Sequence, residues 1–182
     1  MQSAASSENT IQWFAMRFLY NGQPATRKQL EDNGIETFCP MKTVVTTDRK
    51  GRKIKNTIPV VRDLYFVHST RAELDPYVAA NPYFQYRFKI GGSYREPIVV
   101  PENQMSVFIE AVRSSRNPLY FTPQELNIEK GTRIRLIGGN LDGYEGILLK
   151  VKGARAKRLL VEIPNTLIAA VEVSPDLVEI LQ

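Results

Sequence analysis

The chain has 182 residues, of which 43% are hydrophobic and 24% charged, and its formal net charge at pH 7 is +5. This length allows one sizeable domain or two small ones, each with its own core. No apolar run approaches the roughly 18 residues of a membrane-spanning helix, and the first ten residues lack the basic and apolar regions of a secretion signal. We therefore expect a soluble, cytoplasmic protein.

The chain has one cysteine and one histidine, and this limits its chemistry. Cys39 cannot form an internal disulfide, and the lone His68 leaves no Cys/His cluster for zinc. The sequence also lacks a P-loop, a GxSxG motif and an HExxH motif. We expect no catalytic residues, no metal site and no cofactor, and thus not an enzyme.

Positive charge is concentrated in one segment. Between Lys42 and Arg62 there are seven basic residues and only one acidic residue, Asp48, so this segment carries +6 and the rest of the chain sums to −1. A second basic group comprises Lys150, Lys152, Arg155, Lys157 and Arg158. Each group is either the solvated tip of a hairpin or a surface for an anionic partner.

The first two thirds of the chain alternate between strand and helix patterns. Residues 11–20 form an aromatic strand, and a helix follows from Pro24 to a stop at Gly34. Two β-rich arms, 35–47 and 57–69, predict a long hairpin with a basic turn around Gly51.

The next segments complete this domain. Residues 71–81 predict a short helix, and residues 84–90 alternate as a half-buried strand. A helix opening at Pro101 carries a stripe for packing on the sheet, formed by Met105, Phe108, Ile109 and Val112. The order βαββαβα predicts an α+β sandwich.

The last third reads differently. Residues 114–124 contain two prolines and no periodicity, as expected of a linker. About five short strands separated by Gly, Pro or Asn turns follow, which favours a small barrel. The predicted organisation is a disordered tail at 1–10, a domain at 11–113, a linker at 114–124 and a barrel at 125–182.

The C-terminal part resembles the KOW motif. The resemblance rests on Gly131, the strand 132–137, Gly138-Gly139, Leu141, Gly143, Gly146, the strand from Ile147, and 158–161. We expect Gly143 and Gly146 to adopt backbone angles that a Cβ would resist.

The N-terminal part resembles the N-terminal (NGN) domain of NusG proteins. The matching features, in order, are Trp13-Phe14, the following helix, Cys39-Pro40, the charged hairpin, the strand 64–67, residues 90–92, and Pro97-Ile98 before the last helix. The resemblance implies an NGN-type α/β sandwich followed by a KOW, SH3-like β-barrel. Where general NusG proteins have Pro-Gly before the aromatic strand, this chain has Arg62-Asp63. It therefore looks most like the UpxY-type antiterminators of capsular polysaccharide loci, with RfaH and LoaP as functional cousins.

This family implies a monomeric transcription elongation and antitermination factor that binds the clamp of RNA polymerase. By alignment, Leu64 and Phe66 contact polymerase, with Phe18 or Arg17 beside them. We expect one pair of side chains in the strand 64–67 to be exposed for this purpose and the other buried. The alternative, in which all four are core residues, remains open.

Two further surfaces follow from the resemblance. The basic residues expected to face non-template or upstream DNA are Arg27, Lys28, Arg49, Lys50, Arg52, Lys53 and Lys55. The barrel would bind ribosomal protein uS10 or termination factor Rho through Leu141, Tyr144, Pro164 and Leu167. Leu141 and Tyr144 could instead cap the barrel core.

A rival interpretation is a ribosome-associated KOW protein that binds RNA. It explains the basic residues between Lys150 and Arg158, but it leaves the N-terminal half without a role.

Overall fold

The computed structural model describes residues 9–19, 24–126, 131–152, 155 and 157–181. Residues 1–8 of the predicted tail and the end of the predicted first strand, Tyr20, lie outside this range. The chain divides into two compact units, residues 1–101 and 102–182. The composition of the sequence predicted a boundary after residue 113.

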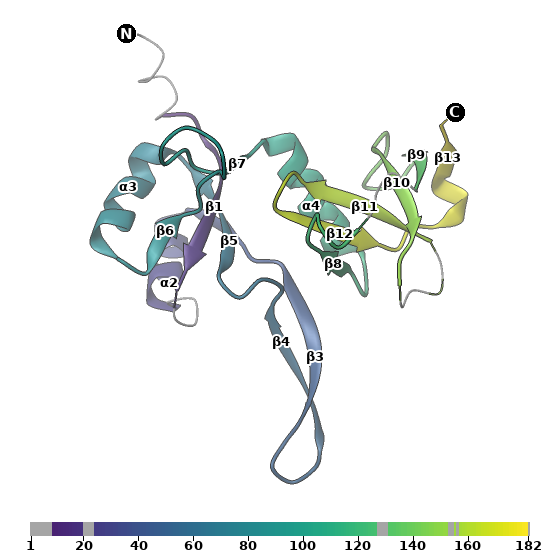
Figure 1. Cartoon of the computed structure of the whole chain (residues 1–182), viewed down its shortest axis with the longest axis horizontal. Helices are drawn as coiled ribbons and strands as arrows, with labels where there is room; N and C mark the ends of the chain where they lie inside the picture. Colours follow the sequence, from purple (N-terminus) through teal and green to yellow (C-terminus); the bar gives the residue numbers. More distant parts are fainter. Residues whose placement is uncertain (1–8, 20–23, 127–130, 153–154, 156, 182) are drawn as a thin grey trace. The chain divides into compact units, whose positions relative to one another are not determined.

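In its described residues, the first unit contains a five-stranded antiparallel sheet, two helices and a separate two-stranded ribbon (Figure 1). Its elements are β1 (Gln12–Phe18), α2 (Pro24–Asp32), β2 (Glu36–Phe38), β3 (Met41–Thr47), β4 (Lys53–Pro59), β5 (Leu64–Ser69), α3 (Arg71–Ala80), β6 (Phe84–Tyr86) and β7 (Val99–Val100). The sheet order is β2-β5-β1-β6, and β7 also pairs with β1. β3 and β4 pair only with each other among the described strands.

One face of the central sheet forms a core with both helices. Leu30 of α2 and Leu74 of α3 are fully buried in it. The strand residues of this core are Phe14, Met16, Phe18, Tyr65, Val67, Phe84 and Tyr86. Because side chains alternate along a strand, the intervening residues of β1 and β5 lie on the opposite face.

Local sequence signals define both helices. α2 begins at Pro24, whose fixed φ suits the first helical turn. It ends where Gly34 adopts φ +76, with the N–H of Ile35 bonded to the carbonyl of Leu30 at 3.0 Å. α3 begins after Thr70, whose side chain accepts a hydrogen bond from the N–H of Glu73.

The predicted long hairpin is present, but each arm is divided into two strands. The inner parts, β2 and β5, belong to the central sheet, and the outer parts, β3 and β4, form the ribbon. Between the pairs Phe38↔Phe66 and Met41↔Pro59, the first arm advances three residues and the second advances seven. The extra residues, 60–63, form a bend that includes Asp63.

The predicted strand 84–90 is correct only at its start. Phe84 and Tyr86 are buried, whereas Phe88 is 41% and Ile90 104% exposed. β6 ends at Tyr86, because the alternating side chains continue past the edge of the core. Apolar alternation alone could not indicate where the core ends.

The second unit contains a helix and a six-stranded antiparallel sheet. Its elements are α4 (Glu102–Ser114), β8 (Leu119–Phe121), β9 (Thr132–Leu136), β10 (Glu145–Lys150), β11 (Lys157–Ile163), β12 (Leu167–Val171), the 3-10 helix η2 (Pro175–Leu177) and β13 (Val178–Ile180). The sheet order is β13-β9-β10-β11-β12-β8. β8 lies within the segment predicted as a linker, where it pairs with β12.

α4 packs against β11 and β12. Its buried residues are Met105, Phe108, Ile109 and Ala111, so Ala111 replaces the predicted Val112, which is only partly buried. A second group of buried residues in this unit consists of Val151, Leu160, Ile168 and Ala170. β11 and β12 therefore form the centre of the unit.

Arg158 belongs to the second basic group, which was expected either as a solvated hairpin tip or as a surface for an anionic partner, but it is 5% exposed and fits neither role. Its guanidinium donates to the carbonyl of Asn117 at 2.6 Å and to that of Ala170 at 3.2 Å. It also pairs with Glu172 at 2.5 Å. Arg158 therefore fastens the chain before β8 to the centre of the sheet.

The two glycines of the KOW resemblance have different roles. Gly143 has φ +76, as predicted. Gly146 has no positive φ, and it is required for space: a Cβ there would lie 2.7 Å from Cδ1 of Leu159 and 3.3 Å from the carbonyl oxygen of Leu160.

We expect Gly146→Ala to destabilise the second unit by about 1–2 kcal/mol, because the added methyl group overpacks a region that includes backbone. Urea unfolding of the variant would measure this cost. Gly51→Ala is a control for the loss of a glycine with open space around it, since its cost is conformational only. A cost for Gly146→Ala below that of Gly51→Ala would contradict the steric explanation.

Candidate functional site

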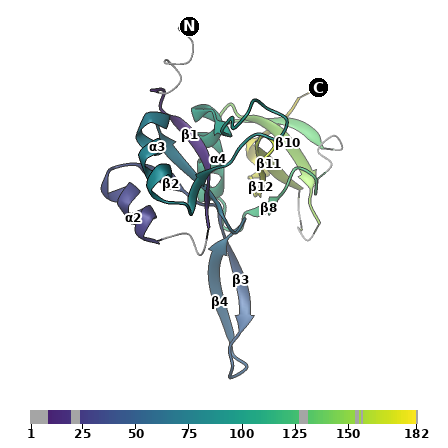
Figure 2. The same ribbon diagram turned by 60° about the vertical axis from the view of Figure 1, so that its left-hand side comes forward.

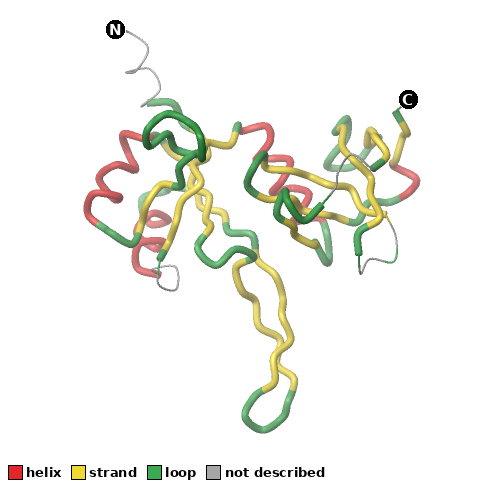
Figure 3. The backbone as a smooth tube through the Cα atoms, viewed as in Figure 1, coloured by secondary structure: helices red, strands yellow, loops and turns green. Residues whose placement is uncertain are grey.

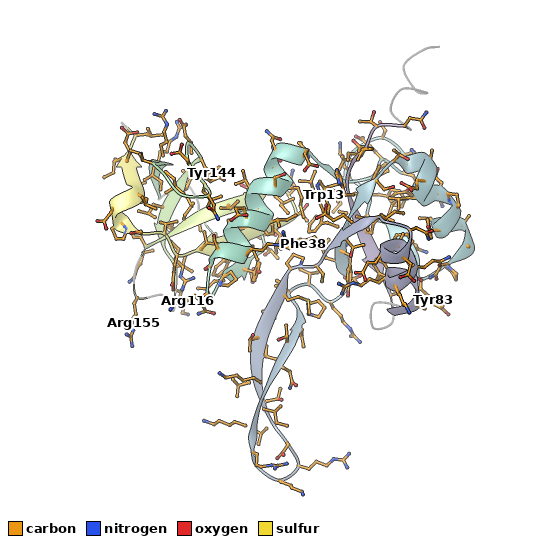
Figure 4. All side chains as sticks on the ribbon, turned by 180° about the vertical axis from the view of Figure 1, so that it is seen from behind. Trp13, Phe38, Tyr83, Arg116, Tyr144 and Arg155 are labelled. Atoms are coloured by element: carbon orange, nitrogen blue, oxygen red, sulfur yellow. The ribbon has the colours of Figure 1, made fainter. Side chains whose placement is uncertain are left out.

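The β3–β4 ribbon projects from the sheet of the first unit as a two-stranded arm (Figures 1 and 2). A turn at 48–52 closes its far end (Figure 3). Nearly all of its side chains are exposed, and they point into solvent along its length (Figure 4). The sequence therefore places its densest positive charge on the part of the first unit that extends furthest from the core.

Asp48 organises the turn. Its Oδ1 accepts from the backbone N–H groups of Lys50 and Arg52, both at 2.8 Å, and its Oδ2 pairs with Nε of Arg52 at 2.9 Å. The hydrogen bond from the Arg52 backbone is the largest cause that holds the pKa of Asp48 below its usual value. Arg52 is therefore partly neutralised, whereas Arg49, Lys50, Lys53 and Lys55 pair with no carboxylate among the described residues.

The register of the ribbon separates its two faces. Lys53 pairs across from Thr47, and Lys55 from Val45, so both lysines lie on one face. The other face carries Ile54 and Ile58, which are 42% and 38% exposed. Val45 and Met41, 59% and 38% exposed, lie on the face of the two lysines, and Lys42 lies across from Ile58 on the other face. Both faces of the ribbon therefore carry cationic and apolar side chains.

α2 carries the other two predicted nucleic-acid residues, but it lies beside the central sheet, away from the tip of the ribbon (Figure 1). Arg27 pairs through Nε with Oε1 of Glu31 at 2.8 Å, and this hydrogen bond is the main cause of the lowered pKa of Glu31. Lys28 is exposed. The structure therefore does not gather all seven predicted residues into one surface.

The sheet face opposite the helix-packed core carries three of the four residues predicted to contact polymerase. We call it the Trp13 face, formed by Trp13, Ala15, Arg17, Leu64, Phe66 and His68. Arg17 lies directly across from Leu64, and Ala15 from Phe66. Phe18 does not belong to this group, because it packs in the helix-covered core and is 1% exposed.

The expectation that one pair of the strand 64–67 is exposed was wrong. Leu64, Tyr65, Phe66 and Val67 are all at most 8% exposed. The alternative that all four are buried describes the structure. On the Trp13 face the accessible predicted residue is Arg17, with 47% of its side chain exposed.

Arg17 belongs to a charged cluster that the sequence analysis missed. Its Nε pairs with Oδ2 of Asp63 at 2.9 Å, and Nη2 of Arg87 pairs with Oδ1 of the same carboxylate at 2.6 Å. The cluster therefore carries a net charge of +1. The only indication of this cluster in the sequence was Arg62-Asp63, which stands where general NusG proteins have Pro-Gly.

In the second unit, two of the four predicted partner-binding residues lie together. Leu141 and Tyr144 line a cavity of about 490 Å³ between the β9–β10 turn and α4. Nδ2 of Asn140 donates to Oε1 of Glu110 on α4 at 2.6 Å, next to this cavity. Burial is the main cause that raises the pKa of Tyr144.

The other two residues do not line this cavity. Pro164 is exposed in the β11–β12 turn, and Leu167 is 1% exposed. Leu167 therefore acts in packing in this structure.

The described residues offer neither a metal-binding cluster nor a membrane-spanning helix. They contain no group of three or more His, Cys, Asp or Glu side chains placed to hold a metal ion. They also contain no helix that is long and apolar enough to cross a membrane.

These features define an α+β protein of two units with a projecting basic ribbon. The family model described as NusG, transcription termination factor nusG, matches residues 11–109, which is more than half of the chain. The chain therefore belongs to the NusG family of transcription factors.

Two solved structures are similar to the chain. A structure described as domain interaction in Thermotoga maritima NusG has 16% identity, covers 95% of this chain and 98% of its own, and gives a TM-score of 0.46. The MjSpt4:Spt5 complex in conformation B has 14% identity, covers 93% and 96%, and gives a TM-score of 0.25. No curated protein matches the chain.

Proposed function

We propose that this protein is an elongation and antitermination factor that binds the clamp of RNA polymerase and promotes processive transcription of a specific operon, one for polysaccharide biosynthesis. The observation that carries the proposal is the basic ribbon projecting from a NusG-family domain. Lysines and arginines on a projecting arm attract phosphate and release counterions, with little dependence on sequence. The partner of the ribbon is therefore non-template or upstream DNA.

Polymerase binds at the edge of the Trp13 face in this proposal. Arg17 supplies an accessible cation there, held by Asp63 and supported by Leu64 across the strand pair. The second unit acts as a KOW domain and binds uS10 or Rho at the cavity next to Leu141 and Tyr144.

The ribbon can be tested with a variant in which Arg49, Lys50, Arg52 and Lys53 are all replaced by alanine. We expect its affinity for duplex DNA at low salt to fall about tenfold, with a flatter dependence on salt, because phosphate contacts are lost. Binding by fluorescence anisotropy at several salt concentrations, and run-through of pause sites by purified polymerase, measure the two effects.

The second unit offers a matched control with the same change in net charge, in which Lys150, Lys152, Arg155 and Lys157 become alanine. This variant should retain DNA binding and pause-site run-through. Equal losses in both variants would show that only total charge matters. Association of the wild type with ribosomal subunits and not polymerase, abolished in the control variant, would favour the rival RNA-binding function.

A further inference from the structure

A loop between β6 and β7, residues 88–97, carries the most exposed apolar side chains of the first unit. Ile90 is 104% and Tyr94 90% exposed, against 41% for Phe88 at the base of the loop. Exposed apolar residues are common singly, but this one loop carries both a fully exposed isoleucine and a nearly fully exposed tyrosine. No step of the proposed function uses it.

This loop is held in shape by bonds between its two arms. Phe88 pairs with Pro97 as a β-bridge, and the N–H of Lys89 donates to the carbonyl of Glu96 at 2.9 Å. The carboxylate of Glu96 accepts from Nζ of Lys89 at 2.5 Å and from the N–H of Ser93 at 3.1 Å. Because these bonds fix both arms, little conformational entropy is lost when a ligand binds the tip.

A cation lies against the exposed ring. Cζ of Arg95 is 5.4 Å from the centroid of the Tyr94 ring, at cation–π distance. Lys89 and Glu96 neutralise each other, and in the described part of the chain Arg95 pairs with no carboxylate. The tip therefore presents an open aromatic face next to one uncompensated positive charge.

This combination matches the chemistry of an unpaired nucleotide. A base stacks on an aromatic ring irrespective of its identity, and a neighbouring guanidinium binds the phosphate that follows it. A duplex cannot use the site in this way, because its bases are stacked inside the helix. A purely apolar protein surface would gain nothing from Arg95 at the tip.

We propose that the 88–97 loop is a binding site for single-stranded nucleic acid, in which Tyr94 stacks on an unpaired base and Arg95 contacts phosphate. The site is separate from the ribbon, and it deepens the proposed function, on which it rests, by adding a contact with an unpaired base to the ribbon's contact with the phosphate backbone. The two surfaces differ in what they read: the ribbon attracts any phosphate backbone, and the loop requires an exposed base.

The test titrates the full chain against a labelled poly-dT oligonucleotide, a poly-U oligonucleotide and a duplex of the same length. We expect Tyr94→Ala to weaken binding to a single strand about tenfold, the loss of one stacked base, and to leave duplex affinity within about twofold. Tyr94→Phe keeps the ring and should behave as the wild type. The ribbon variant should instead weaken binding to single strands and duplex alike. A preference between the two oligonucleotides identifies DNA or RNA as the source of the base.

Three results would overturn the proposal. The first is no measurable single-strand binding by the wild type at low salt. The second is an equal effect of Tyr94→Ala on single strands and duplex. The third is loss of polymerase capture by Tyr94→Ala with unchanged affinity for oligonucleotides, which would make the loop a protein contact.

Polymerase capture by the wild type tests the proposed function separately. A failure of the proposed function is therefore distinguishable from a failure of the loop site. Since Tyr94 is 90% exposed, its replacement should not disturb folding.

Discussion

Arg158→Ala is expected to destabilise the second unit by about 3 kcal/mol, because it leaves the buried carbonyl of Ala170 and the part-buried carbonyl of Asn117 without this donor. The guanidinium satisfies the carbonyls of Asn117 and Ala170, and it is itself 5% exposed. Glu172 is 58% exposed in its side chain, so water can solvate that carboxylate after the change. The cost therefore comes mainly from the two carbonyls and the lost packing of the aliphatic stem.

Hydrogen exchange of the β11 and β12 amides measures this loss directly in the second unit. Arg158→Lys should recover only part of the stability, because one ammonium cannot reproduce the planar fork that reaches both carbonyls and Glu172. Arg135→Ala is the matched control: Arg135 pairs with Glu145 at 2.6 Å, but 46% of its side chain is exposed, so its removal should cost much less stability than the removal of Arg158. Similar costs for Arg158→Ala and Arg135→Ala would contradict the role given to the buried guanidinium.

The sequence predicted most elements of the first unit because each carries a local signal. Pro24 and Gly34 bound α2, and Gly51 lies in the turn between two β-rich arms. The division of those arms was not predictable, because the four extra residues of the second arm are defined only by pairing between distant strands. The alternating pattern of a strand shows which of its side chains share a face, but it does not show which residue of another strand each one pairs with.

A candidate site could be predicted only where the amino-acid composition of a segment indicated it. The basic ribbon follows from charge and strand propensity alone. Phe18 was predicted to contact polymerase because of the family alignment. Alternation along the strand would have placed it correctly, because Phe18 lies four residues after the core residue Phe14 and so on the same face. The roles of Arg87 and Arg158 were invisible in the sequence, because each depends on a carboxylate or carbonyl many residues away.

Asp63→Ala is expected to destabilise the first unit by about 2 kcal/mol. The carboxylate is 25% exposed in its side chain and pairs with two guanidinium groups, at 2.9 Å to Arg17 and 2.6 Å to Arg87. Its removal leaves these two cations close together, with no other carboxylate within ion-pair distance among the described residues. The Arg17 pair contributes less than the Arg87 pair, because Arg17 is 47% exposed and water screens its charge.

Urea unfolding followed by Trp13 fluorescence measures this effect, since Trp13 is the only tryptophan and lies on the same strand and face as Arg17. Glu31→Ala breaks an exposed pair with Arg27 and serves as control, and we expect it to cost much less stability than Asp63→Ala. Adding Arg87→Met to Asp63→Ala removes a part-buried cation that has lost its carboxylate, so the double variant should be more stable than Asp63→Ala alone. If the second change brings further loss, Arg87 stabilises the sheet by packing and not through Asp63. If it restores stability, the cost of Asp63→Ala comes from the Arg87 guanidinium left without a counter-charge, and the carboxylate of Asp63 stabilises the first unit by neutralising that cation next to Arg17.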